Sequence, residues 1–101
     1  MTDFQEHVLV LEILAELQRA RTKFPGKNPT LAALMEEVGE LAKATFEEPR
    51  ANVRKEAVQV AVMAMRMILD GDQLYEPWRA EYGLDPLVPY PQGDDNDRTR
   101  T

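Results

Sequence analysis

Apolar residues near the start of the chain recur at steps of three and four, the spacing of one face of a helix. This pattern predicts a helix over residues 3–23. The apolar face is wide, so we expect other elements to cover it on more than one side; its positions are Phe4, Val8, Leu9, Val10, Leu11, Ile13, Leu14 and Leu17. Two prolines and a glycine within residues 24–29 end this helix.

A second helix is predicted from about Thr30, a residue type that caps helix N-termini, to Glu47-Glu48-Pro49. The stripe expected to face the core is Leu31, Leu34, Met35, Val38, Leu41, Ala42 and Thr45. At 100° per residue, three acids fall on the opposite face: Glu36, Glu37 and Glu40. Acids in that position commonly form a solvated face. These acids, however, lie beside small residues and lack a basic residue four positions on, which suits close approach of a cation or of another helix.

A third helix is predicted over residues 50–69. Apolar residues cover well over half of its circumference, so we expect it to be central and buried. Its polar residues fall on one line along the helix: Asn52, Glu56, Gln59, Arg66 and Asp70. Unpaired polar groups are costly to bury, so this line is expected either to face the acids of the second helix, through a bridging metal, or to face water.

The remaining sequence predicts a short helix over residues 73–82 and then a tail. Together these patterns predict an all-α fold, with a helical domain at 1–83 and a Pro-rich, acidic tail at 84–101. About the last ten residues are polar and lack apolar anchors, so they are expected to be disordered.

Composition limits the chemistry. A chain of 101 residues is one domain with a modest core, so burial shared with a second copy is plausible. There is no cysteine and only one histidine, so a metal would be held by oxygen, which favours Mg²⁺, Mn²⁺ or Ca²⁺. A net charge of −6 argues against a nucleic-acid-binding surface. No apolar run reaches membrane-spanning length and no signal-peptide pattern is present, so the expected location is cytoplasmic.

The acids have the spacing of a metal site. Glu37 and Glu40 share one helix face, and so do Glu56 and Gln59, so two antiparallel helices could each present two oxygen ligands to one point. Converging carboxylates repel one another, and a hard divalent cation relieves that repulsion. Mg²⁺ keeps several waters and binds substrate phosphates.

These motifs resemble the MazG-like all-α nucleoside triphosphate pyrophosphohydrolases, whose pattern is two adjacent acids, a third acid three residues on, and a later Glu-x-x-Asp. The resemblance covers roughly residues 4–82. It includes the Phe24-Pro25 loop and the run at 65–72, and Gln59 stands where the family has Asp. It implies a helical protomer that assembles into a bundle as a homodimer or homotetramer. It also implies Mg²⁺-dependent hydrolysis of a (d)NTP substrate to a (d)NMP and pyrophosphate, a reaction that can cleanse nucleotide pools; Mn²⁺ could replace Mg²⁺.

The resemblance also implies roles for individual residues. The expected metal ligands are Glu37, Glu40, Glu56 and, with one neutral oxygen, Gln59. Glu36 and Glu37 are the expected catalytic residues, and Glu36 would bind a further metal or orient the attacking water. Expected substrate contacts are Lys23, Lys27, Arg66 and Arg79 on phosphates and Trp78 on the base. A neutral Gln59 lowers the expected metal affinity. This leaves open a weakened nucleotide- or metal-binding module, or a helical oligomerisation module, of the same fold.

Overall fold

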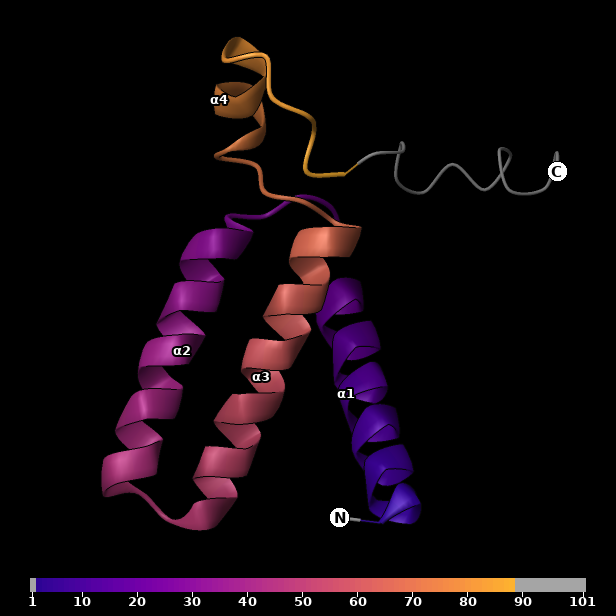
Figure 1. Ribbon diagram of the computed structural model, residues 1–101, viewed down its shortest axis with the longest axis vertical. Helices are drawn as coiled ribbons and strands as arrows, with labels where there is room; N and C mark the ends of the chain where they lie inside the picture. Colours follow the sequence, from indigo (N-terminus) through magenta and orange to yellow (C-terminus); the bar gives the residue numbers. More distant parts are fainter. Residues whose placement is uncertain (1, 89–101) are drawn as a thin grey trace, which may run out of the picture.

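A computed structural model describes residues 2–88, which form four α-helices and no β-strand (Figure 1). They are α1 (Asp3–Lys23), α2 (Thr30–Glu47), α3 (Arg50–Leu69) and α4 (Glu76–Glu81). The all-α prediction and the three long helices are confirmed, and α4 is shorter than the predicted 73–82. The predicted disorder of the last ten residues lies outside the described part of the chain.

The helices α2 and α3 form an antiparallel hairpin, and α1 packs against α3 (Figure 1). The connection between α2 and α3 is only Glu48 and Pro49, so the chain must reverse at once. Leu17 and Ala20 of α1 meet Val58 and Val62 of α3 in a small core. The prediction that α3 is central is therefore confirmed.

The burial of α2 follows the prediction only in part. Its buried residues are Thr30 and Ala44, and Glu37 is half-buried, as are three members of the expected core stripe: Leu31, Leu34 and Leu41. The rest of the stripe is exposed, with Met35 61% and Val38 40% exposed, so the single chain covers only part of it. Ala44 is fully buried, which the small size of its side chain permits in a close helix pair.

The burial of α3 is also less complete than predicted. Val58, Val62 and Arg66 are buried, but Ile68 is 73% exposed. The predicted polar line does not face one partner either. Its residues form hydrogen bonds with different neighbours: Asn52 with Glu48, Gln59 with Glu16 on α1, and Arg66 with Asp70 and the 24–29 loop.

A set of polar residues that we call the end network closes one end of the bundle; it consists of Arg21, Thr30, Arg66, Asp70 and Asp72. Asp70 accepts hydrogen bonds from Arg66 Nε at 2.8 Å and from Arg21 Nη2 at 2.7 Å. The carboxylate of Asp72 accepts from the backbone N–H of Leu31 and from two N–H groups before α4.

The end network corrects the predicted cap of α2. Thr30 is the first residue of the helix, and its hydroxyl donates to the backbone oxygen of Gly71 at 2.7 Å instead of capping. Asp72, from the far end of α3, supplies the capping acceptor. Gly71 has φ +74°, and a Cβ there would lie 2.8 Å from Val88 Cγ2, so this turn favours glycine.

The short helix α4 lies beyond the closed end of the bundle (Figure 1). Glu76 anchors it by accepting from the backbone N–H of Leu87 at 2.7 Å, and Lys27 lies 3.9 Å from the same carboxylate. In the described part of the chain, no helix combines the length and apolar character that a membrane span requires.

Candidate metal centre

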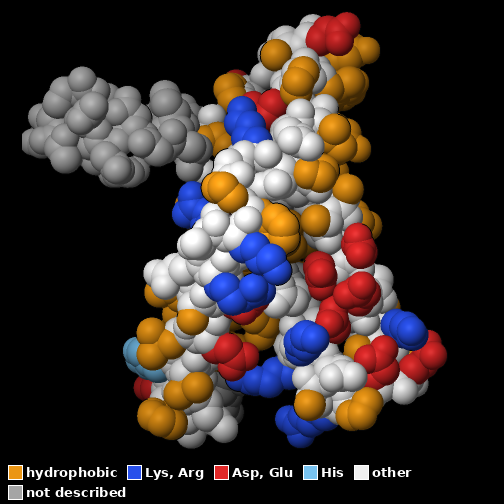
Figure 2. All heavy atoms as spheres, turned by 180° about the vertical axis from the view of Figure 1, so that it is seen from behind, with side chains coloured by type: hydrophobic (Ala, Val, Ile, Leu, Met, Phe, Trp, Pro, Cys, Tyr) orange, Lys and Arg blue, Asp and Glu red, His pale blue; other side chains and the backbone are white. Residues whose placement is uncertain are grey.

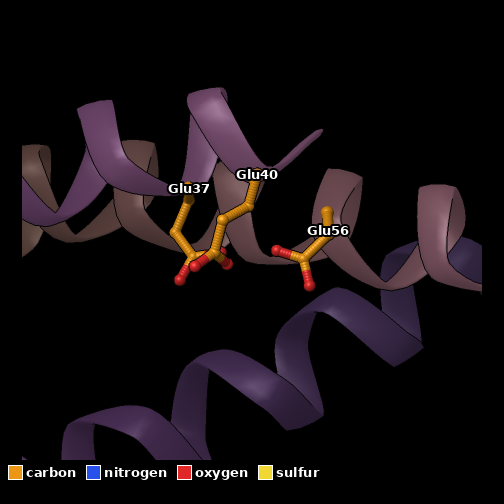
Figure 3. Close-up of side chains that lie close together, drawn as sticks. All are labelled: Glu37, Glu40 and Glu56. Atoms are coloured by element: carbon orange, nitrogen blue, oxygen red, sulfur yellow. The ribbon is translucent and has the colours of Figure 1, made fainter. Parts of the chain in front are cut away.

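The hairpin brings three carboxylates together, which we call the acid cluster: Glu37, Glu40 and Glu56. Glu37 and Glu40 lie one turn apart on α2, and Glu56 faces them from α3 (Figure 3). One oxygen from each side chain lies within 4.8 Å of the others. The sequence predicted this convergence, and the antiparallel register of the hairpin produces it.

Two oxygens of the acid cluster are buried without a hydrogen-bond partner. They are Oε2 of Glu37 and Oε2 of Glu56. A buried acceptor that loses water and gains no donor costs about 1–3 kcal/mol, and more if it is charged. The side chains therefore fit a bound cation, which would satisfy both oxygens.

The electrostatics of Glu40 reflect the same crowding. A shared proton with Glu56 and like-charge repulsion from Glu56 raise the pKa of Glu40, and Glu48 adds to the rise, whereas Lys55 opposes it. Glu40 therefore holds its proton more tightly than an isolated carboxylate does. A cavity of about 250 Å³, lined by Glu40, Lys43, Glu48 and Glu56, opens beside it, which leaves room for water ligands.

Two predicted members of the site lie outside the acid cluster. Glu36 is exposed on α2, adjacent in sequence to Glu37. Gln59 turns toward α1, where its Nε2 donates to Glu16 Oε1 at 3.0 Å. The predicted fourth ligand is therefore engaged elsewhere, because a carboxylate on α1 offers its amide a charged acceptor.

Most of the predicted substrate contacts are engaged at the end of the bundle. Arg66 is 3% exposed and donates to Asp70 and to the backbone oxygen of Phe24, so its guanidinium is engaged within the chain. Lys23 lies over the Phe24 ring, with its Nζ 5.4 Å from the centroid. Lys27 pairs with Glu76.

The two predicted contacts on α4 also lie away from the acid cluster. Arg79 donates to the backbone oxygen of Asp85 at 2.7 Å, and the Trp78 ring packs against Tyr82, with 4.7 Å between centroids and a tilt of 41°. Glu37 is seven residues into α2, about 10 Å along the helix from its start. Since α4 lies beyond that start, these residues do not line the cluster of their own chain.

Sequence reasoning missed the polar residues that α1 and α3 share. Glu16 is bonded to Arg19 and to Gln59, and Arg54 of α3 is 2.8 Å from Glu12. The hydrogen bonds from Arg19 and from Gln59 lower the pKa of Glu16, and Arg19 contributes most. The available signal was the helical spacing of Glu12, Glu16 and Arg19 on one face of α1.

Models of known protein families, curated protein sequences and solved structures were compared with the chain, and none of them matches it. The functional argument therefore rests on the residues and their geometry.

Proposed function

We propose that the protein is a divalent-metal-dependent nucleoside triphosphate pyrophosphohydrolase, which converts a (d)NTP to a (d)NMP and pyrophosphate. One observation carries the proposal: three carboxylates from two helices converge within 4.8 Å, and two of their buried oxygens have no partner. The resemblance of the Glu36–Glu40 and Glu56 motifs to MazG-like enzymes supports the reaction class.

In this proposal Glu37, Glu40 and Glu56 hold Mg²⁺ or Mn²⁺. When bound, such a cation polarises a phosphoryl group and lowers the pKa of water. Glu36 lies on the exposed rim next to Glu37, where its carboxylate can accept a proton from a water approaching the substrate. The half-buried position of Glu37 limits water around the ligands, which strengthens the electrostatic attraction.

The proposal includes a homodimer or homotetramer. Large apolar side chains are exposed on three helices of the single chain, with Leu11 63%, Met35 61% and Ile68 73% exposed. Apolar patches of this kind commonly mark interfaces between protein chains. A second copy that covers α2 would bury the stripe that the sequence predicted as core.

A second candidate function is metal or nucleotide binding with little turnover, or oligomerisation alone, on the same fold. The observation that favours it is the contact of Gln59 with Glu16, which leaves the acid cluster with three carboxylates. Three carboxylates with waters can still bind a divalent cation, although more weakly than four.

The test is pyrophosphate release from a panel of canonical and modified (d)NTPs with Mg²⁺ or Mn²⁺. We expect turnover by the wild type and a loss of about 100-fold or more in Glu40→Gln, because a ligand oxygen is replaced by a neutral amide. The matched control is Glu47→Gln, an exposed acid on α2 outside the cluster.

Equal turnover by Glu40→Gln and wild type would exclude catalysis at this cluster. Stabilisation by Mn²⁺ without release from any nucleotide would favour the binding module instead, since a ligand that binds the folded state raises its melting temperature.

A further inference from the structure

A groove between α1 and α3 lies beside the acid cluster and carries the opposite charge. It has a volume of about 540 Å³, in the range of small-molecule sites, and we call it the α1–α3 groove. Its charged and amide lining residues are Glu12, Glu16, Arg19, Arg54, Lys55 and Gln59. Three cations stand against two carboxylates, so the groove is net positive in a chain of net charge −6.

The groove and the acid cluster are neighbours. Lys55 lines the groove. Glu56 follows Lys55 directly and is one turn from Gln59, another lining residue. Figure 2 shows basic and acidic side chains on adjoining parts of one face of the bundle.

We propose that the α1–α3 groove binds the polyphosphate end of the substrate, next to a cation held by the acid cluster. This inference rests on the proposed function and names the part of the substrate that the basic residues take. The ligand chemistry is a chain of two or three phosphates, bound by Arg19, Arg54 and Lys55.

The cations of the groove are paired in a way that a phosphate can replace. Arg54 is 2.8 Å from Glu12, and their side chains are 55% and 40% exposed. Arg19 pairs with Glu16 within α1, and its side chain is 58% exposed. Exposed ion pairs contribute little to stability, so breaking them costs little. A phosphate group can accept two charge-assisted hydrogen bonds from one guanidinium, which makes it a good replacement for the carboxylate. Lys55 is in no ion pair in the described part of the chain.

Gln59 suits this groove better than an acid would. Its amide donates to Glu16 and adds no negative charge to the lining. An aspartate at this position would oppose a phosphate chain in the groove. Gln59 therefore lowers the expected affinity of the acid cluster for a cation but favours binding of an anion in the α1–α3 groove.

The test measures binding of inorganic tripolyphosphate and pyrophosphate by calorimetry, with and without Mn²⁺, so that no turnover is needed. We expect binding by the wild type and a weakening of about tenfold or more in Arg54→Gln and in Lys55→Gln. Mn²⁺ affinity alone should change by less than about threefold in these variants. The matched control is Arg50→Gln, which removes a charge from the same helix but outside this groove.

Three results would overturn the proposal: no tripolyphosphate binding by the wild type, equal binding by the Arg54 and Lys55 variants, or an equal loss in Arg50→Gln, which would indicate only net charge. The outcome is separable from that of the proposed function. Loss of tripolyphosphate binding in Arg54→Gln, without turnover of any nucleotide by the wild type, would support the groove as a phosphate site and contradict the proposed enzymatic function. Wild-type turnover with unchanged kcat/KM and unchanged tripolyphosphate binding in Arg54→Gln would support the enzymatic function and contradict phosphate binding in the groove.

Discussion

The end network and the acid cluster both gather carboxylates where helices meet, but only the end network gives each carboxylate a donor. Asp70 has two guanidinium partners, and Asp72 accepts three backbone N–H groups. In the acid cluster, by contrast, carboxylates face one another, and Oε2 of Glu37 and of Glu56 have no partner.

This difference separates charged side chains that stabilise the fold from charged side chains that are available to bind a ligand. A compensated network is satisfied by the chain itself, and removing one member leaves another buried and unpaired. An uncompensated cluster is destabilising until a cation arrives. The comparison predicts that substitutions in the two regions change stability in opposite directions.

The largest effect is expected in the end network. Arg66→Met removes the buried partner of Asp70 and two hydrogen bonds to the 24–29 loop, and we expect a loss of about 3 kcal/mol in the free energy of unfolding. Urea denaturation measures it. Mn²⁺ affinity of the folded variant should not change, since the acid cluster is left intact.

The control for this prediction is Arg21→Met, because the Arg21 side chain is 40% exposed and water screens its pair with Asp70. Its loss should be about 1 kcal/mol or less. If Arg66→Met were as stable as the wild type, or if it lost Mn²⁺ binding, the division between the two regions would fail.

A smaller effect on stability is expected at Gln59, which belongs neither to the end network nor to the acid cluster. Gln59→Asp removes the hydrogen bond to Glu16 and places two like charges together, so we expect a loss of about 1 kcal/mol in unfolding free energy. Mn²⁺ affinity, measured by calorimetry, should stay within about threefold. Tightening of tenfold or more would instead put residue 59 among the metal ligands.

The smallest effect is a pH dependence of the metal-free protein. The pKa of Glu40 is raised above its ordinary 4.5, so its favourable contribution is complete below pH 4.5 and is lost as pH rises through the folded value. Glu40→Gln should therefore melt a few degrees higher than wild type at pH 7, with no difference near pH 4.5, as followed by circular dichroism.

Glu16 supplies the control of opposite sign. Its pKa is lowered from 4.5, chiefly by Arg19, so its contribution is present above pH 4.5 and is lost as pH falls through the folded value. Glu16→Gln should melt lower than wild type at pH 7, and the gap should close in acid. A Glu40→Gln variant that melts lower than wild type at pH 7 without metal would contradict the repulsion described for the acid cluster.

Local sequence was enough to predict the helices and the acid cluster. The three-and-four periodicity and the loop prolines set the bounds of α1, α2 and α3. The i, i+3 spacing of Glu37 and Glu40, with a two-residue connection to the next helix, brought Glu56 opposite them.

The partners of the polar side chains could not be predicted in the same way. The hydrogen-bond partners of Gln59 and Arg66 depend on which residues of α1 and of the 24–29 loop lie beside α3. Those residues are more than 35 positions away in the sequence. The cap of α2 is a carboxylate from the end of α3, which no local pattern encodes.

The sequence by itself thus determined where the chain is helical, that any metal ligand would be an oxygen, and that Glu37 and Glu40 share a helix face. Short-range backbone geometry and residue chemistry are sufficient for these. Only the tertiary structure decided how far each side of α2 is buried, and that Gln59 donates to Glu16 of α1. Packing rotates each helix to satisfy all of its neighbours together, so the side that is buried depends on contacts between distant segments.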